Sequence, residues 1–339
     1  MTKVRFLILT DHSGHSEHNS LYALTRALAA DARTKSVLVA SRGDKRNEAF
    51  FTGDLEAKIY VAKATAHFDF EADGRQFISS NLTTTFKEAE TVWLRLPPSE
   101  DQQFLSELIE YSPSPSAGVN PVIINHPAGI IETGSKAFLA NFSEHTAPIK
   151  RIFSELDFRR WIAQHETVLK PLQAYGGRGI VRIQNEQVEE NGQLHPLDRW
   201  IDANRHSIES GHYLAMKFLK NVSQGDKRIL VVNGHILGAS LRIPAEGNWL
   251  CNVAQGGSAI PADVSPEEEG MIAAISPVLL DKGVVIFGAD TLVDDDGRRV
   301  LSELNTNSIG GFPQAEAQSN RPVLKQTIDG IYDYLDRYL

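Results

Sequence analysis

The sequence contains one cysteine, Cys251, so no disulfide can form within the chain. This absence is typical of proteins from a reducing compartment. No run of 18 apolar residues occurs, and the apolar segment at residues 4–9 is too short for the core of a signal peptide. We therefore expect a cytoplasmic protein without a transmembrane helix.

Positive charge is also scarce. The chain has 34 Lys and Arg against 43 Asp and Glu, which gives a formal net charge of −9. A chain with this charge is a poor non-specific ligand for nucleic acid or for an anionic membrane, so we expect neither as a partner. It can still bind a small polyanion where its basic side chains gather in one cleft.

Strand-like and helix-like segments alternate along the chain, which predicts an α/β fold, with an α+β arrangement in the C-terminal half. In the first third, strands at 3–10 and 37–40 on either side of a helix over 21–28 predict a small parallel sheet unit. Further strands are expected at 91–96 and 122–124. The segment 185–196 is polar, and we expect turns there. In the last third we expect helices near 266–281 and 322–338, and strands at 213–218, 226–232, 236–243, 284–293 and 299–304.

A glycine loop at residues 176–179 separates two strand-like segments, 168–171 and 180–183. Glycine lets a backbone approach closely and point its N–H groups at phosphate oxygens. The loop is neither a Walker A sequence nor a dinucleotide fingerprint, because a strand rather than a helix follows it. The pattern is consistent both with a flap over phosphates and with an ordinary hairpin turn.

Two lysines belong with this loop. Lys170 ends the strand that precedes it, and Lys136 lies near the start of a helix expected over 132–144. A single lysine is often only a solvated surface charge. At a strand end beside a glycine flap, however, a lysine can neutralise a triphosphate, and this placement favours a phosphate site.

Oxygen-bearing side chains gather in two of the last strands. Glu303 and Asn305 are two residues apart and face the same side of one strand, and Asp290 joins them if the two strands pair. Such a set suits Mg²⁺, which bridges phosphates. A solvated sheet face is the alternative interpretation. The acidic run at 294–297 ends in Asp-Gly, and we interpret it as a hairpin turn.

Two arginines occupy the ends of adjacent strands. Arg228 follows Gly225 and Asp226 at the start of one strand, and Arg242 closes the next. Guanidinium groups in such places can bind carboxylate or phosphate in a bidentate manner. A second glycine turn, residues 252–257, comes after them.

Taken in order, these motifs resemble the ATP-grasp superfamily and, more narrowly, prokaryotic glutathione synthetase, over about residues 125–307. The resemblance implies an ATP-grasp fold with an N-terminal parallel-sheet pre-ATP-grasp domain. The domains would be 1–126, a central flap domain 127–211, and a catalytic domain 212–339.

The resemblance also implies roles for individual residues. ATP would contact Lys136, Lys170, the flap residues Gly176, Gly177 and Gly179, the adenine hinge Met216, Lys217, Phe218 and Leu219, and Asp226. Two Mg²⁺ would be held by Asp290, Glu303 and Asn305. Arg228 would bind the transferred phosphate and Arg242 would stabilise the tetrahedral intermediate. The substrates would lie against Asn252, Gly256, Gly257, Asn307, Ser308, Gly310 and Gly311.

The sequence departs from the family pattern mainly where substrates would bind. The loop 306–312 differs from the family's, and the first loop, 11–20, is rich in histidine rather than lysine. His12, His15 and His18 invite a metal interpretation, but the neighbouring Ser and Gly favour a loop over the cleft. The flap and the adenine hinge also depart from the family pattern. Together the departures leave the ATP-binding residues credible and leave the choice of substrate open.

The implied activity is ATP-dependent joining of a carboxylate to an amine through an acyl phosphate, most specifically of γ-glutamylcysteine to glycine. Two alternatives stay open: a related ligase that makes a different small peptide or amide, and a non-catalytic ATP-binding regulatory protein on the same fold. The partners would be small molecules, and the resemblance implies a homo-oligomer.

Overall fold

The computed structural model describes residues 3–97, 103–118, 121–174, 177–244, 249 and 258–339. Within these ranges the strands are β1 (Val4–Thr10), β2 (Thr34–Ser41), β3 (Ile59–Tyr60), β4 (Ala62–Lys63), β5 (Thr83–Thr84), β6 (Thr91–Arg95), β7 (Val122–Ile124), β8 (Ile149–Ile152), β9 (Thr167–Pro171), β10 (Val181–Gln184), β11 (Gln187–Glu190), β12 (Gln193–Pro196), β13 (Tyr213–Lys217), β14 (Asp226–Val232), β15 (His235–Ile243), β16 (Ser258–Pro261), β17 (Ile286–Val293) and β18 (Arg299–Asn305).

The α-helices in the same ranges are α1 (Ser20–Ala30), α2 (Glu48–Phe51), α3 (Arg75–Ile78), α4 (Gln103–Tyr111), α5 (Pro127–Thr133), α6 (Glu155–Ile162), α7 (Leu197–Glu209), α8 (Pro266–Asp281), α9 (Phe312–Ser319) and α10 (Val323–Leu335). Short 3₁₀ segments are η1 (His12–Gly14), η2 (Lys45–Asn47), η3 (Phe86–Glu88), η4 (Lys136–His145) and η5 (Lys220–Gln224). The helix expected over 132–144 is instead the end of α5 followed by η4. No helix among the described residues is both long and apolar enough to cross a bilayer.

The N-terminal sheet has the order β4-β2-β1-β6-β7, and its last four strands are parallel, as the sequence predicted. In a parallel sheet the carboxyl ends of the strands share one edge, where open α/β sheets bind ligands. Here that edge carries Thr10, Ser41 and Arg95, the last residues of β1, β2 and β6.

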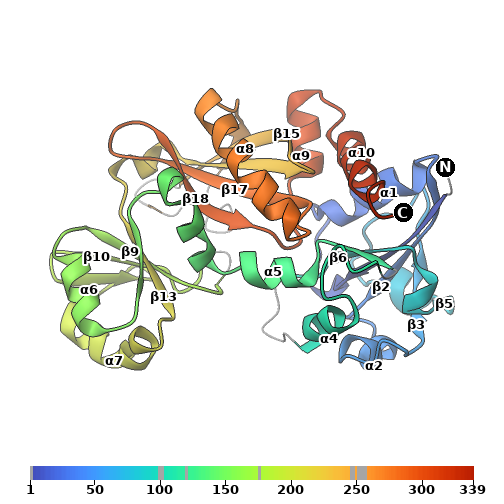
Figure 1. Ribbon diagram of the computed structural model, residues 1–339, viewed down its shortest axis with the longest axis horizontal. Helices are drawn as coiled ribbons and strands as arrows, with labels where there is room; N and C mark the ends of the chain where they lie inside the picture. The colour runs from blue at the N-terminus through green and yellow to red at the C-terminus, as the bar shows by residue number, and fades with distance from the viewer. Residues whose placement is uncertain (1–2, 98–102, 119–120, 175–176, 245–248, 250–257) are drawn as a thin grey trace.

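The central sheet, β12-β11-β10-β9-β13-β8, is antiparallel and lies at one end of the molecule (Figure 1). Helices α6 and α7 cover one face, where Phe158 and Trp200 pack against the sheet. The expectation of turns over 185–196 was wrong, because this segment forms β11 and β12. Left-handed backbone at residues 185–186 and 191–192 makes two tight turns, so the polar residues between them still pair as short strands.

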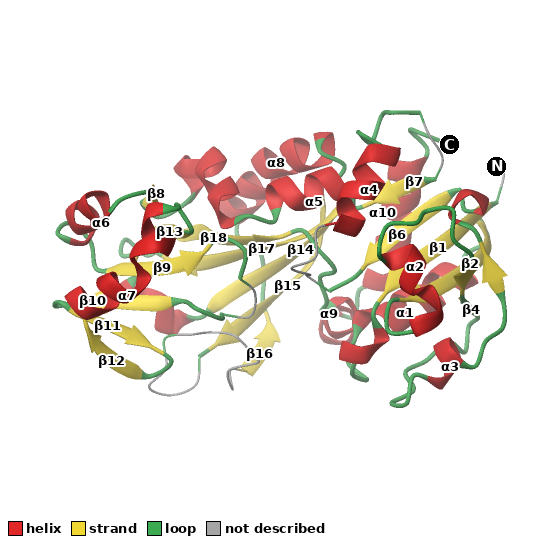
Figure 2. Cartoon of the chain, turned by 90° about the horizontal axis from the view of Figure 1, so that it is seen from below, coloured by secondary structure: helices red, strands yellow, loops and turns green. Residues whose placement is uncertain are grey.

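The C-terminal sheet, β16-β15-β14-β17-β18, is antiparallel throughout, and its two faces bury different partners. Ile229 and Val231 pack with α8, which runs along one face of the sheet (Figure 2). Leu230 and Val232 point the other way and join α9, α10 and Phe6 of the N-terminal sheet in one core. The first and last parts of the chain therefore form a continuous packed body.

A buried amide joins the N-terminal sheet to the C-terminal one. Asn125, just after β7, donates to the carbonyl oxygens of Ile286 and Thr306, at 2.6 and 2.8 Å, and accepts from the N–H groups of Val285 and Ile286. β13 lies in the central sheet, although it falls just after residue 211. The domain boundaries at 126 and 211 remain a prediction.

Candidate active site

The two predicted phosphate lysines lie where the central and C-terminal sheets meet. Lys170, at the end of β9, is buried, and its Nζ donates to the carbonyl oxygen of Ser302 in β18 at 3.1 Å. Burial lowers the pKa of Lys170 from its usual value. Lys136 begins η4, donates to the carbonyl oxygen of Ala174, and lies 3.5 Å from Glu303 Oε1. Both ammonium groups therefore reach the same cleft.

The predicted arginines converge on one buried carboxylate. Arg228 grips Asp290 in a bidentate manner, with Nε to Oδ1 at 2.7 Å and Nη2 to Oδ2 at 2.6 Å. Arg242 Nη2 donates to Asp290 Oδ2 at 2.7 Å and also to Asp226. The strand register explains this cluster, because Arg228 lies opposite Asp290 and Asp226 lies opposite Arg242.

The four charges perturb one another strongly. Burial opposes ionisation of Asp290, but Arg228 and Arg242 outweigh it and hold the pKa of this carboxyl below its usual range. Burial, together with the negative charge of Asp290, raises the pKa of Asp226. Within the described residues, Asp226 Oδ1 and Arg242 Nε are buried without a hydrogen-bond partner. Burying a polar atom without a hydrogen-bond partner is costly to the folded state.

The predicted metal ligands come together as the sequence pattern required. Asp290 lies directly opposite Glu303 in the β17–β18 pair, and Asn305 Nδ2 donates to Asp290 Oδ2 at 3.1 Å. Two carboxylates and one amide make an oxygen donor set that suits a hard divalent cation. Both Asp290 oxygens also accept hydrogen bonds from arginines, so a cation there would replace one of these contacts. No group of three His, Cys, Asp or Glu side chains suited to a metal occurs in the described part of the chain.

Two adjoining cavities hold most of the predicted site. The larger, of about 410 Å³, is lined by Lys136, Gly177, Arg228, Arg242, Glu303, Asn305, Gly310 and Gly311. The smaller, of about 80 Å³, is lined by Lys170, Asp226 and the hinge residues Met216, Lys217, Phe218 and Leu219. Ile180 and Glu303 line both. A charged chamber therefore opens into a narrow, largely apolar slot.

The hinge is anchored through its main chain. The N–H of Lys217 donates to Pro148 at 2.9 Å and that of Phe218 donates to Glu166 at 2.7 Å. The Lys217 ammonium pairs with Asp295 at 2.8 Å, in the β17–β18 turn. The acidic run at 294–297 is thus a hairpin turn, as expected, and one of its members supports the hinge.

The predicted substrate residues do not all come together. Gly310 and Gly311 line the large cavity, whereas Asn307 lines a separate cavity of about 40 Å³ together with Arg42. Ser308 adopts a left-handed backbone, with φ of 44°. Gly177 and Gly179 also have positive φ. Gly176, Asn252, Gly256 and Gly257 lie outside the described residues.

The histidines of loop 11–20 do not form a shared site among the described residues. His12 stacks on Phe77, with ring centroids 4.9 Å apart, and its Nδ1 lies 2.6 Å from Ser41 Oγ. His15 hydrogen-bonds with Thr10 and Tyr22 at 3.0 and 2.8 Å. His18 is exposed. The loop interpretation agrees with this geometry.

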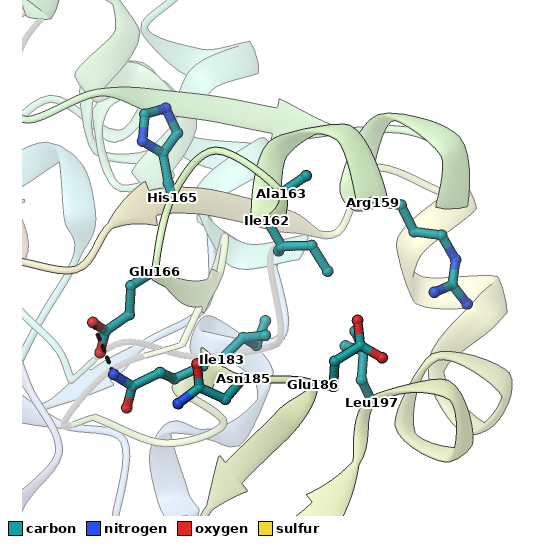
Figure 3. Close-up of a pocket in the computed structure, with 10 residues that line it drawn as sticks. Arg159, Ile162, Ala163, His165, Glu166, Ile183, Asn185, Glu186 and Leu197 are labelled. Carbon is teal, nitrogen blue, oxygen red and sulfur yellow. Dashed lines mark hydrogen bonds between the residues drawn. The ribbon is translucent and has the colours of Figure 1, made fainter.

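The sequence did not indicate several residues in or near the site. Trp249 lines the small slot, and Gln314 and Gln318 of α9 line the large cavity. Arg182, paired with Glu166, lies over the ring of the slot residue Phe218. The glutamines are four residues apart on one helix, a spacing that could have indicated a shared face. A further cavity of about 500 Å³ lies between α6 and the β10–β11 turn, and its lining contains none of the predicted site residues (Figure 3).

Comparison with known proteins agrees with this geometry. The family model of the prokaryotic glutathione synthetase ATP-grasp domain matches residues 135–320. The chain belongs to this family. The glutathione synthetase of Parasynechococcus marenigrum (strain WH8102) is 31% identical over 243 residues, which cover 71% of this chain and 74% of that protein. That of Neisseria meningitidis serogroup A (strain Z2491) is 26% identical over 295 residues, 84% and 87% of the two chains.

Solved structures share the fold along the whole chain. A D-cycloserine synthetase, DcsG, superposes with a TM-score of 0.64 at 14% identity and covers 98% of this chain and 99% of its own. A D-alanine–D-alanine ligase from Bacillus anthracis has a TM-score of 0.55 at 13% identity, with 98% of both chains covered. The predicted ATP-grasp fold is therefore confirmed. As a member of this family the protein is an ATP-dependent ligase that forms a C–N bond and uses a divalent metal.

Proposed function

We propose that the protein is a glutathione synthetase, which joins the cysteinyl carboxylate of γ-glutamylcysteine to the amine of glycine at the expense of ATP. The observation that carries this proposal is the convergence of Lys136, Lys170, Arg228 and Arg242 with Asp290 and Glu303 at two adjoining cavities. The names of the curated relatives agree with it.

The proposed first half-reaction is attack of the cysteinyl carboxylate of γ-glutamylcysteine on the γ-phosphorus of ATP, which gives an acyl phosphate and ADP. The protein supplies positioning and charge neutralisation rather than covalent chemistry. Lys136 and Lys170 would bind the phosphates from the central part, and Arg228 the transferred group from β14.

In the second half-reaction the amine attacks the acyl carbon, a C–N bond forms, and phosphate leaves. Arg242 faces this step with a buried Nε that has no hydrogen-bond partner within the described residues. A pre-oriented donor of this kind stabilises the oxyanion that develops in the transition state. No enzyme nucleophile is required, so Cys251 is expected to be dispensable.

We further propose that the divalent metal is Mg²⁺, with two ions held by Asp290, Glu303 and Asn305. When bound, Mg²⁺ would neutralise the phosphate oxygens and polarise the transferred phosphoryl group. The donor set fits because the register opposes Asp290 and Glu303 on one face. In the absence of an ion, Arg228 and Arg242 balance the charge of Asp290.

A direct test is ADP release in the presence of Mg-ATP, with γ-glutamylcysteine and glycine omitted in turn. The proposal predicts release only when both are present, with glutathione appearing in equal amount. Cys251→Ala should keep full activity. Release that needs a different carboxylate–amine pair would contradict the substrate assignment and leave the ligase assignment standing.

A second candidate, a sibling ligase for another small peptide, is favoured by one observation. The loop that differs from the family pattern borders the large cavity through Gly310 and Gly311, and it is fixed to loop 11–20 by a hydrogen bond from Gly311 N–H to Ser20 Oγ at 3.0 Å. Both unusual loops therefore shape one wall. A screen of amines with γ-glutamylcysteine, and of carboxylates with glycine, distinguishes the two candidates.

A further inference from the structure

One residue outside the cleft holds the hinge residue Phe218 at two points. The carbonyl oxygen of Glu166 accepts from the N–H of Phe218 at 2.7 Å. The side chain of Glu166 accepts from Arg182 Nε at 2.7 Å, and the Arg182 guanidinium carbon lies 3.9 Å from the centre of the Phe218 ring. Main chain and ring of Phe218 are thus fixed from the same position.

The strand register places Arg182 beside the small slot. Arg182 on β10 lies opposite Val168 on β9, which lies opposite Met216 on β13. Directly opposed residues share one face of a sheet, and Val168 and Met216 line the slot. The Arg182 side chain therefore projects from the face of the sheet that borders the slot, and its guanidinium reaches the Phe218 ring at the edge of the slot.

Glu166 is itself tightly oriented. Its Oε1 accepts from Arg182, and its Oε2 accepts from Gln184 Nε2 at 3.3 Å, a contact drawn in Figure 3. The Glu166 and Arg182 side chains are 22% and 24% exposed, so solvent screens this pair only in part. A planar guanidinium can donate hydrogen bonds to Glu166 through its edge while its face stacks on the Phe218 ring. A lysine ammonium has no planar face and cannot stack in this way.

We propose that the Glu166–Arg182 pair is a positioning element of the nucleotide site: it fixes the Phe218 ring and so preforms the slot for the adenine base. This inference rests on the proposed function, in which the slot receives the base of ATP. The pair acts through Phe218 and not on the phosphates. Its loss should weaken nucleotide binding while leaving the chemical step unchanged at saturating ATP.

The test compares Arg182→Met with the wild-type protein. The variant should raise KM for ATP and the calorimetric Kd for Mg-ADP by about tenfold, which corresponds to about 1.4 kcal/mol. Its kcat at saturating ATP and its KM for the amine should stay at wild-type values. Unchanged nucleotide affinity, or an equal fall in every parameter, would overturn the inference.

Arg205→Met is the matched control, because Arg205 on α7 is also ion-paired, with Glu155 and Asp202, but lies on the outer face of the central sheet. It should leave Kd for Mg-ADP unchanged. Glu166→Gln keeps the size of the side chain and should weaken Mg-ADP binding about threefold. Should Arg182→Met not fold, the Glu166→Gln result alone decides.

The double variant Glu166→Gln/Arg182→Met tests the shared route through Phe218. If both residues act through one ring, the double variant should bind Mg-ADP no more weakly than Arg182→Met alone. Additive losses would overturn that route. A wild-type protein that binds no Mg-ADP would refute the proposed function itself, whereas binding that is insensitive to both variants refutes only the positioning role.

Discussion

The phosphate end and the substrate end of the cleft are built from different materials. At the phosphate end, Arg228, Asp290 and Glu303 project from neighbouring antiparallel strands whose register sets their spacing. At the substrate end, loop residues Gly310 and Gly311 form the wall next to α9, and the N–H of Gly311 donates to Ser20 Oγ, 291 residues away in the chain. In the proposed reaction, the strands would position the groups that act on the phosphates, and the loops would contribute to the choice of substrate.

The difference extends to charge. The strand-built end carries buried ions that balance one another, with Asp290 bound by two arginines. Among the described residues, the loop-built end carries the buried Arg95, whose Nη2 donates to the carbonyl oxygen of Ile309 at 2.8 Å, and a half-buried Arg42–Asp11 ion pair. Substitutions at the first end should therefore alter both charge balance and turnover, whereas those at the second should mainly alter loop conformation.

The largest effect is expected from Asp290→Asn. It leaves Arg228 and Arg242 without their shared counter-charge, which should lower the free energy of unfolding by about 3–5 kcal/mol. It also removes the carboxylate that we propose as the central metal ligand, so turnover should fall by about 10²–10³-fold. Urea unfolding and ADP release measure the two effects. Asp296→Asn, an exposed aspartate in the β17–β18 turn, is the control, and wild-type turnover in Asp290→Asn would refute the metal assignment.

Lys170→Met should separate function from stability. Lys170 is buried, and burial lowers its pKa. Keeping this side chain charged therefore lowers the free energy of unfolding. An apolar side chain of similar length should leave the free energy of unfolding unchanged or raise it by about 1 kcal/mol. The kcat/KM for ATP should fall by about 10²-fold. A variant that loses stability and keeps kcat/KM would show that Lys170 is structural.

The comparison of the two ends also explains which features the sequence alone could predict. The spacing of Glu303 and Asn305, and the pairing of their strand with that of Asp290, follow from local alternation, and both are observed. The strand at 226–232 and the helix at 266–281 likewise have the predicted bounds. Long apolar segments and helix caps indicate their own secondary structure. The strands and the helix at the phosphate end of the cleft were therefore largely predictable from the sequence.

The missed features depend on contacts between distant segments. Nothing near Arg182 in the sequence indicates that its guanidinium lies on Phe218, because β10 and the hinge meet only in the folded sheet. Asn307 and Gly310 lie in different cavities, and Ser308 between them has a left-handed backbone that the sequence did not indicate. Strands 187–190 and 193–196 were missed because their polar residues hide the pairing that two tight turns impose.

Gly311→Ala tests the loop-built end. Gly311 precedes α9 with φ of 98°, a backbone conformation that costs an alanine about 1–2 kcal/mol. We expect that loss in the free energy of unfolding, with a higher KM for one substrate and an unchanged KM for ATP. Gly310→Ala is the stability control, because its φ is not positive and its added carbon would meet Ser20 Oγ at an ordinary 3.5 Å. Equal destabilisation by both would show that backbone strain is not the cause.

The smallest effect concerns pH and His15, at the substrate end. Burial, with a smaller contribution from His12 and Arg95 and against the opposing charge of Asp11, lowers the pKa of His15 from 6.5 to about 4. Because the unfolded chain binds a proton below about pH 6.5 and the folded one only near pH 4, stability is full above pH 6.5 and declines as pH falls between these values.

Because the His15 ring is partly exposed, solvent reduces the effect. The free energy of unfolding should fall by about 1 kcal/mol between pH 6.5 and 4. His15→Gln should remove this fall and flatten the dependence of urea unfolding on pH between 6.5 and 4, while His18→Gln, on an exposed neighbour of the same loop, should leave the wild-type profile. A pH profile of His15→Gln that matches the wild type would show that the loop tolerates the charged imidazolium. In that case the hydrogen bonds of His15 with Thr10 and Tyr22, rather than its neutral state, would hold the loop against the substrate end.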